Sequence, residues 1–509
     1  MLKHAPILNL LKKLSTFFSI EFRFLPLLSL LAGALTALAF APFNQVWLIY
    51  LLTAFLFYVW LQAAPGKALL HGWLFGVGMQ FTGVGWIYFS LHYHGGSPTL
   101  FALLLIFFLS AYLSIYTALA GYCVNRFCVA GNPIKLLLLY PMAWAFFEWL
   151  QGIVLTGFSW QQLGYTQIDW PLSGFAPLIG SHGVGLLLAM TSGALVLLLI
   201  DPGWRKKSLL LLSGVWLAGL LLKQIAWTEV AGDEIRVALI QGNIEQSLKW
   251  KRESKIPTLQ RYKQLSLDQE DVDLIIWPET SIPGFQHQLS GYIAGLAKAM
   301  QEKQTDLLAG IFIKDPATGR YYNSLINVNG GEYRKRHLVP LGEYVPLRSL
   351  IEFFNRFMKI PMSDIASGDY DQPLLRAAGQ PLGVSVCFED AFARDVRKDL
   401  PEASLLVNVS NDAWFDGSHE PFQHHAIARM RALESGRYML RATNTGISSV
   451  IGPKGEEIAL SPQFETYVLK AGVWPMQGAT PYILWGDWLL VLGCLGVLGS
   501  FILKARCSS

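Results

Sequence analysis

Residues 381–390 read Pro-Leu-Gly-Val-Ser-Val-Cys-Phe-Glu-Asp, an apolar run that ends abruptly in polar residues. A short, nearly continuous apolar run of this kind is typical of a strand that is buried on both faces of its sheet. Similar runs occupy residues 235–241, 274–277, 307–313, 324–328, 405–409 and 446–451. Helical patterns are expected at 285–304 and 421–440. Because apolar strands alternate with helices, the sequence predicts an α/β layered domain with buried sheets.

Charge is distributed unevenly around this domain. Only 15% of the 509 residues are charged, against about 25% in typical soluble proteins. Residues 1–230 contain 11 Lys or Arg and 5 Asp or Glu, whereas residues 231–480 contain 27 and 30. We therefore expect an N-terminal membrane bundle over 1–230, a soluble domain over 231–480, and a C-terminal transmembrane helix with its tail over 481–509. The net charge of +4 and the lack of a basic stripe argue against a nucleic-acid partner.

About eight membrane-spanning helices are predicted, seven of them before the soluble domain, since a span needs about 20 mostly apolar residues. With the N-terminus in the cytoplasm, the outer loops contain no Lys or Arg, and the inner loops contain them. The positive-inside rule then predicts a multi-pass protein of the inner membrane with its soluble domain on the periplasmic face. The predicted spans are 24–41, 46–63, 69–91, 99–124, 136–155, 184–200, 208–225 and 483–503.

Cys387 is the only cysteine of the predicted soluble domain, so no disulfide can form within that domain. A cysteine at a strand end, on a tight turn into a helix, is exposed to substrate and lies beside backbone N–H groups that can stabilise an oxyanion. The alternative is a buried core cysteine, which is the commoner case. The polar residues that follow favour a nucleophile. The other cysteines lie in or beside apolar segments: Cys123, Cys128, Cys494 and Cys507.

A thiol of ordinary pKa needs a neighbouring group to become a thiolate. Glu279 directly follows the apolar run 274–278, where a raised pKa would suit a general base, although it could instead be a carboxylate at a helix start. Lys335 could stabilise thiolate and oxyanion, or be one more charge in the solvated run 333–337. Glu343 adds a second carboxylate. The residues alone leave these alternatives open.

The membrane part offers two further candidates for substrate binding. Glu148 lies within the predicted fifth span, where an ionisable group is a functional candidate, or else bonds a neighbouring helix or loop. Trp160 lies in the outer loop 156–181, which could line a lipid-accessible mouth or form an interfacial aromatic belt. The ten histidines show no metal-ligand spacing, so neither a metal nor a cofactor is expected.

Three motifs, in this order along the chain, resemble the nitrilase superfamily of carbon–nitrogen hydrolases. They are Trp277-Pro-Glu279, Lys335-Arg-His337-Leu and Val386-Cys387-Phe-Glu389. The resemblance implies an αββα sandwich and a Glu-Lys-Cys triad. Five longer stretches resemble apolipoprotein N-acyltransferases, at residues 159–167, 241–250, 337–346, 410–415 and 428–434.

That family transfers a fatty acyl chain from a phospholipid, typically phosphatidylethanolamine, to the α-amino group of the diacylglyceryl-cysteine of apolipoproteins. The resemblance therefore implies two membrane-anchored partners, the phospholipid donor and the diacylated apolipoprotein acceptor, and a chain that acts as a monomer without cofactors. It makes Glu279 the base, Lys335 the group that stabilises the oxyanion, and Cys387 the residue that forms a thioester.

The resemblance also implies supporting residues. Glu343 and Glu389 fall on residues that support the triad, and Trp250 falls on an active-site aromatic. Trp414 lies in one of the matched stretches and is a candidate for substrate binding. Phe388 is a departure, because relatives often carry Tyr there, which removes a hydroxyl but leaves the backbone N–H.

Two other functions compete with this hypothesis. The first is a membrane-tethered amidase or nitrilase, which the triad permits but which has no need of eight spans. The second is a transporter with an extracytoplasmic binding domain, against which stand the few charges in the spans and the lack of paired broken helices.

Overall fold

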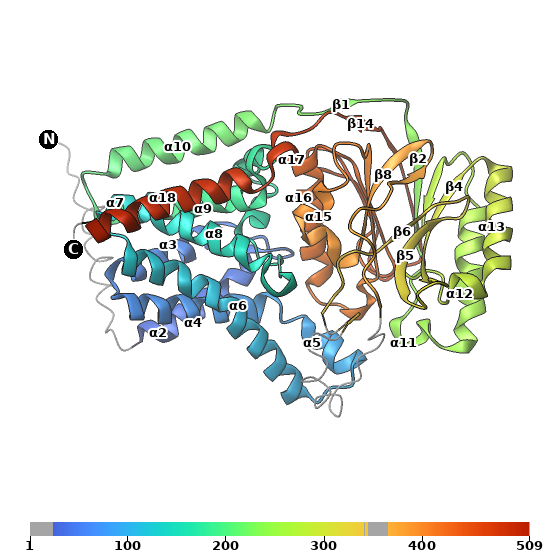
Figure 1. Cartoon of the computed structure of the whole chain (residues 1–509), viewed down its shortest axis with the longest axis horizontal. Helices are drawn as coiled ribbons and strands as arrows, with labels where there is room; N and C mark the ends of the chain where they lie inside the picture. Colours follow the sequence, from blue (N-terminus) through green and yellow to red (C-terminus); the bar gives the residue numbers. More distant parts are fainter. Residues whose placement is uncertain (1–23, 341, 345–364, 508–509) are drawn as a thin grey trace.

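The computed structural model describes residues 24–340, 342–344 and 365–507. A helical bundle and a sandwich of two β-sheets lie end to end, and the sandwich lies between helical layers (Figure 1). The linker that follows α10 (Arg205–Leu222) leads from the bundle to the sandwich, and α18 (Trp488–Cys507) returns along the bundle. The predicted basic N-terminal tail, with Lys3, Lys12, Lys13 and Arg23, lies outside the described residues.

A helix lies in each of the eight apolar windows predicted from the sequence. Among the described residues, however, only the helices at 99–127, 171–200 and 488–505 have the length and hydropathy of a membrane span. A fourth span results if 65–83 and 87–94, which are bent by 59°, count as one. The number of spans therefore stays a prediction. The remaining bundle helices are α2 (Leu25–Leu35), α3 (Trp47–Gln62), α4 (Pro65–Gly83), α5 (Ile87–Phe89), α6 (Thr99–Phe127), α7 (Asn132–Ile134), α8 (Tyr140–Gln151), α9 (Ala176–Ile200) and α17 (Pro481–Trp485).

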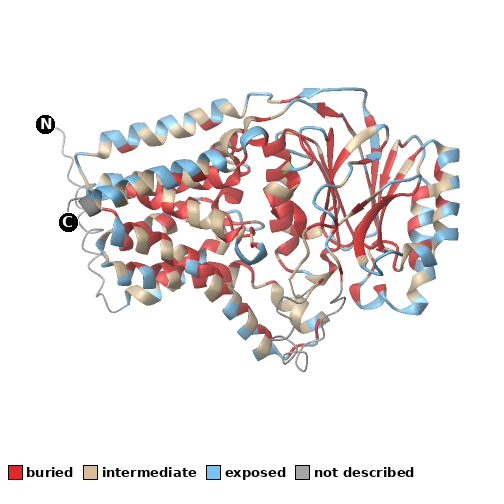
Figure 2. Ribbon diagram, in the orientation of Figure 1, coloured by how far each residue is buried: buried red, intermediate tan, exposed pale blue. Residues whose placement is uncertain are grey.

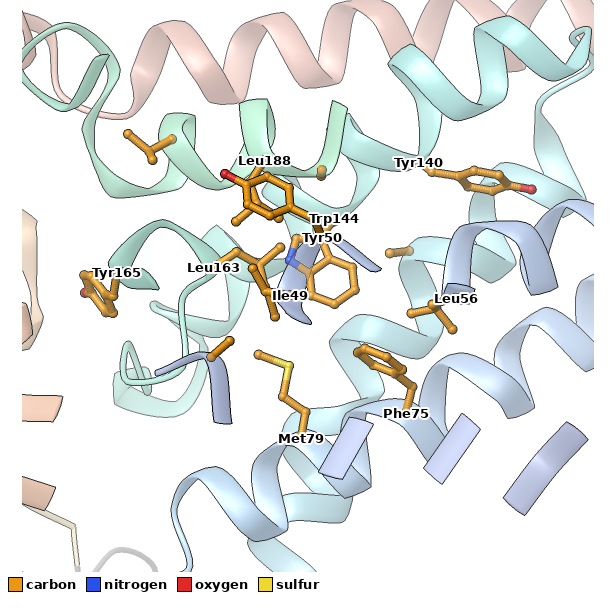
Figure 3. Close-up of a cluster of buried hydrophobic side chains, with 14 of the residues drawn as sticks. Ile49, Tyr50, Leu56, Phe75, Met79, Tyr140, Trp144, Leu163, Tyr165 and Leu188 are labelled. Carbon is orange, nitrogen blue, oxygen red and sulfur yellow. The ribbon is translucent and has the colours of Figure 1, made fainter. Parts of the chain in front are cut away.

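The bundle packs around aromatic side chains and closely approaching backbones. Phe75, Tyr140 and Trp144 are buried at its centre (Figure 3). Helices α2 and α4 come so close that a Cβ added at Gly78 would lie 2.1 Å from the carbonyl oxygen of Leu30. Small residues at such crossings are typical of helices that associate in a membrane. The outer faces of α10 and α18 stay exposed, as expected of surfaces that meet lipid (Figure 2).

The soluble part is a four-layered αββα sandwich, as the resemblance implies. In each sheet three parallel strands form the centre, β2-β3-β4 in the first and β8-β9-β10 in the second. Apolar side chains from both sheets, among them Leu239, Leu308, Val386 and Val407, form the core between them. The first sheet contains β13 (Tyr467–Val473), β2 (Ile235–Gln241), β3 (Leu274–Ile276), β4 (Asp306–Lys314), β5 (Tyr321–Asn327) and β6 (Glu332–Arg334). The second contains β12 (Glu457–Leu460), β11 (Ser449–Ile451), β10 (Met439–Thr443), β9 (Leu405–Ser410), β8 (Gln380–Val386) and β7 (Leu375–Ala377).

Helices cover the outer faces of both sheets. On the first lie α12 (Arg252–Leu267) and α13 (Ser290–Lys303), after the short α11 (Gln246–Lys249). On the second lie α15 (Ala393–Arg397) and α16 (Glu420–Ser435), and this layer packs against the bundle (Figure 1). Residues of α16 belong to the same apolar cluster as the bundle core. A two-stranded pair, β1 (Glu229–Val230) with β14 (Met476–Gln477), lies where the chain enters and leaves the sandwich.

The predicted helix over 421–440 is too long. Helix α16 ends at Ser435 because Gly436 adopts a left-handed conformation with φ 63°, a common way to end a helix. Strand β10 follows at Met439–Thr443 and was not predicted. Its middle residue, Arg441, is fully buried and breaks the apolar pattern that marks the other central strands.

Candidate active site

Cys387 lies where the central strand β8 ends. It is the first residue of the short 3-10 helix η9 (Cys387–Ala391) and has φ 55°. A left-handed conformation at a residue with a side chain costs about 1–3 kcal/mol and recurs at active sites, where surrounding contacts maintain it. The first N–H groups of a helix have no partner within it. The turn therefore carries the thiol at a strand end, as predicted from the sequence, and the oxyanion role of its N–H groups stays a prediction.

The structure brings Glu279 and Lys335 to the same cavity as Cys387. Glu279 follows strand β3, and Lys335 follows strand β6, so both come from the first sheet. Cys387 comes from the second sheet. The three side chains thus meet where the two sheets face each other, and the cavity that they line also contains residues of the bundle.

The side chain of Lys335 is 1% exposed and lies between two carboxylates. Its Nζ is 2.8 Å from Oε2 of Glu343 and 3.9 Å from Oε1 of Glu279. Asn323 donates from Nδ2 to both carboxylates, at 2.7 Å to Glu279 and 2.9 Å to Glu343. Burial opposes the charged ammonium, but Glu343 and Glu279 outweigh it and raise the pKa of Lys335 above its ordinary value. Lys335 therefore stays positively charged at neutral pH.

The thiol and its neighbouring carboxylate both have raised pKa values. Burial, and then the charge of Glu279, raises the pKa of Cys387 to about 12. Burial also raises the pKa of Glu279; Lys335 opposes this rise, and the neighbouring Glu343 adds to it. The resting thiol therefore holds its proton at neutral pH. A carboxylate with a raised pKa is well matched to accept that proton when the sulfur attacks a substrate.

Glu389 connects the Cys387 turn to the segment that carries Lys335. Its Oε1 accepts hydrogen bonds from the backbone N–H groups of Arg336 at 2.7 Å and His337 at 2.9 Å. Its Oε2 accepts from the backbone N–H of Val386 at 2.6 Å, and Tyr333 donates its hydroxyl to the same carboxylate. Burial raises the pKa of Glu389 to about 7, although Lys335 and these N–H groups oppose the rise. This carboxylate thus fixes the distance between the lysine and cysteine segments.

The aromatic candidates divide into two groups. Trp250 and Trp414 line the cavity with the triad residues. Phe388 instead packs its ring against Trp160, with centroids 5.9 Å apart, in a cluster that faces the bundle. The ring of Phe388 also lies near His337, with centroids 6.1 Å apart.

Trp160 and Glu148, predicted as substrate-binding candidates, are not among the described residues that line this cavity. Trp160 is buried and donates its indole N–H to Oε1 of Gln423 at 2.7 Å. Glu148 accepts hydrogen bonds from the indole of Trp144 at 3.2 Å and the backbone N–H of Leu163 at 3.0 Å. Glu148 thus bonds a neighbouring loop, as its alternative interpretation expected. Trp160 is buried and bonded to the catalytic domain, which fits neither a lipid-accessible mouth nor an interfacial aromatic belt.

Among the polar residues of the site that were not predicted are Asn323 and Lys249. Asn323 directly precedes the predicted strand 324–328, and only its pairing with the two carboxylates reveals its role. Lys249 is buried and donates from Nζ to the backbone carbonyl of Glu279 at 3.2 Å. Burial lowers the pKa of Lys249 to about 8, against the opposing charges of Glu279 and Cys387. The sequence could have pointed to Lys249, because this residue precedes Trp250 in the matched stretch 241–250.

Comparison with known proteins identifies the family. A model of the apolipoprotein N-acyltransferase N-terminal domain matches residues 32–194, and a carbon-nitrogen hydrolase model matches residues 236–477. The apolipoprotein N-acyltransferase of Methylococcus capsulatus is 43% identical over 484 residues, which are 94% of this chain and 96% of that protein. The chain belongs to the apolipoprotein N-acyltransferase family. The family's protein from Vibrio vulnificus is 39% identical and covers 92% of this chain and 94% of its own length.

Two solved structures each match about half of this chain. A carbon-nitrogen hydrolase from Helicobacter pylori G27 covers 47% of this chain and 88% of its own, with 18% identity and a TM-score of 0.35. A Nesterenkonia amidase variant covers 51% and 97%, with 16% identity and a TM-score of 0.36.

Replacing Glu343 with Gln tests the charge balance of the site. Glu343 raises the pKa of Glu279, and its removal also leaves Lys335 with Glu279 as its remaining carboxylate neighbour. Both effects stabilise ionised Glu279. The acid limb of the pH–rate profile for acyl transfer should therefore move to lower pH, and the plateau rate should fall at least about tenfold because Glu279 becomes a weaker base.

The matched control is Glu332→Gln. Glu332 is close to Lys335 in the sequence, but its carboxylate pairs with Arg334 and not with Lys335. Its profile should stay that of the unmodified enzyme. An acid limb that stays in place, or moves to higher pH, in Glu343→Gln would contradict the assigned charge balance.

Proposed function

We propose that this protein transfers a fatty acyl chain from a membrane phospholipid, phosphatidylethanolamine, through a thioester on Cys387 to the α-amino group of the diacylglyceryl-cysteine of apolipoproteins. One observation carries the proposal. A single cavity contains Cys387, Glu279 and Lys335 of the soluble domain together with Ser90, Leu91 and Gly95 of the membrane bundle. A nucleophile at the junction of a bundle and a sandwich suits substrates that are anchored in a membrane.

In the first half-reaction the sulfur of Cys387 attacks the ester carbonyl carbon of the phospholipid, and Glu279 takes the thiol proton. The charged ammonium of Lys335 stabilises the negative oxygen of the tetrahedral intermediate. The ester C–O bond then breaks, and the leaving oxygen takes the proton from Glu279. The products are lysophospholipid and a thioester on Cys387.

In the second half-reaction the free α-amine of the apolipoprotein attacks the thioester carbonyl. Glu279 takes a proton from the attacking nitrogen, and Lys335 again stabilises the oxyanion. The C–S bond breaks, and the departing sulfur recovers a proton from Glu279. The products are an amide on the apolipoprotein and the free thiol, so the enzyme returns to its starting state.

The proposed domain organisation separates the membrane-spanning residues from the catalytic residues. We assign residues 1–230 to a bundle of about seven spans, 231–480 to the catalytic domain and 481–509 to an eighth span with a cytoplasmic tail. The absence of Lys and Arg from the predicted outer loops supports an inner-membrane protein with a periplasmic catalytic domain. We also propose that the protein acts as a monomer, as the family resemblance implies.

Replacing Cys387 with Ser tests the nucleophile. A hydroxyl is a much weaker nucleophile than a thiol in a site with a carboxylate base, so acyl transfer from labelled phosphatidylethanolamine to a diacylated lipopeptide should fall at least about 1000-fold. Cys123→Ser, which changes a thiol in the bundle, should keep normal activity. Substantial acyl transfer by folded Cys387→Ser enzyme would rule out Cys387 as the nucleophile.

Labelling an engineered cysteine tests the orientation. Gln301 is exposed on α13, far from the bundle (Figure 1), and the Gln301→Cys variant can be made in a background without the native cysteines. A membrane-impermeant maleimide should label it in intact spheroplasts. Labelling only after the cytoplasmic side is opened would reverse the proposed topology.

A further inference from the structure

A second cluster of buried charges lies directly behind the nucleophile and takes no part in the proposed proton transfers. Its charged members are His424 and Glu420 on α16, Asp390 on η9, Asp412 after β9, and Arg441 on β10. All five are at most 2% exposed. Burying so many charges is costly unless each one is paired, so their arrangement needs an explanation.

Together with Asn408, the side chains of the cluster form a ring of hydrogen bonds and ion pairs that includes the backbone carbonyl of Cys387. Nε2 of His424 lies 3.3 Å from that oxygen and 2.8 Å from Oδ1 of Asp390. Both neighbours are acceptors, so Nε2 carries a proton. On the other side Asn408 donates from Nδ2 to the same carbonyl at 3.2 Å.

Arg441 contacts both Asn408 and Asp390 and so, through Asp390, connects the two groups that bond the Cys387 carbonyl from either side. Its Nη1 donates to Oδ1 of Asn408, which turns the amide nitrogen of Asn408 toward Cys387. Its guanidinium also lies 3.1 Å from Asp412 and 3.6 Å from Asp390. The orientations of both donors to the Cys387 carbonyl are thus fixed by charged partners.

His424 has a carboxylate near each ring nitrogen. Its Nδ1 lies 3.2 Å from Glu420 and 3.6 Å from Asp412. Burial and Arg441 oppose a charged imidazole, but Asp390 and Asp412 outweigh them and hold its pKa well above the ordinary value. The ring of Trp160, which belongs to the bundle core, contacts the imidazole with centroids 5.2 Å apart.

We propose that His424 is a positioning residue for the nucleophile: its Nε2–H, with Asn408, holds the carbonyl of Cys387 and so keeps this left-handed residue in the backbone conformation that directs the thiol into the cavity. The inference rests on the proposed role of Cys387. His424 touches neither substrate nor the reacting sulfur. It acts through the backbone of the residue that does.

Two isosteric substitutions separate the hydrogen bond from the charge. In His424→Gln the side-chain amide nitrogen can occupy the place of Nε2 and still donate to the Cys387 carbonyl. In His424→Asn the shorter amide reaches only the place of Nδ1. Both variants remove the positive charge of the imidazole.

The matched control is His425→Asn. His425 is the next residue on α16 and is also buried, but it faces Glu457 at 3.0 Å and Ser449 at 3.2 Å, away from Cys387. Full-length enzyme in detergent is incubated with labelled phosphatidylethanolamine, and the rates of Cys387 acylation and of its alkylation by iodoacetamide are measured per folded molecule.

The His424→Asn variant should lower kcat for acylation at least about tenfold with KM for the phospholipid unchanged, since small displacements of a reacting group cost large factors in rate. Alkylation should slow in parallel, a result that a merely structural role would not produce. His424→Gln should stay within about threefold of the unmodified enzyme, and His425→Asn should match it.

Normal acylation by His424→Asn would overturn the proposal. An equal loss in both His424 variants would trace the effect to the lost charge and would also overturn it. Failure of both to fold, while His425→Asn folds, would assign His424 to the fold itself. Retained acyl transfer by Cys387→Ser would instead remove the proposed function, so the two failures are distinguishable.

Discussion

The ammonium of Lys335 is buried at the meeting point of the two sheets, and a buried cation is tolerated only with close opposite charges. Glu343 and Glu279 provide them, and Asn323 bonds both carboxylates. This one constraint fixes several others. It sets the position of the base, holds a positive charge beside the sulfur, and requires the segments after β3 and β6 to converge on the turn after β8. Glu389 then joins the lysine segment to that turn through backbone hydrogen bonds.

The bundle and the sandwich form one structure around this site. Gln423 on α16 accepts hydrogen bonds from Trp86 at 3.2 Å and Trp160 at 2.7 Å, so two indoles of the membrane part are bonded to the catalytic domain. The neighbouring His424 contacts the Cys387 carbonyl. Helix α16 is therefore both the surface on which the domain meets the bundle and the support behind the nucleophile. This explains why its polar residues are as buried as its apolar ones.

Sequence patterns identified the site residues that follow apolar strands, but they missed the polar residues that lie inside buried strands. Glu279 and Cys387 directly follow apolar runs, and the parallel strands of each sheet place such residues at the carboxyl edge of that sheet. Asn323 and Arg441 lie inside strands, where a polar residue only weakens the apolar pattern. Their partners are distant in sequence and become visible only in three dimensions. For the same reason the sequence pattern predicts a helix that extends into β10.

The bundle shows a related limit. Each of the eight apolar windows contains a helix, but among the described residues only three helices, or four with the bent pair, have the length and hydropathy of a span. Bends such as that at Gly180, with φ 66°, depend on tertiary contacts that hydropathy does not report. Tyr482 lies so close to Gly180 that an added Cβ would come within 2.4 Å of its ring. The topology therefore rests on the pattern of charges in the loops more than on helix length.

If Cys387 carries the acyl chain between two lipid substrates, the mass of the intact enzyme after incubation with phosphatidylethanolamine alone should reveal it. We expect a mass increase of one acyl chain on Cys387 and one lysophospholipid released per enzyme. The added mass should be lost when a diacylated lipopeptide with a free α-amine is supplied. A lipopeptide with that amine acetylated should leave the acyl-enzyme intact. An unmodified cysteine in an enzyme that still transfers acyl chains when both substrates are present would contradict the account.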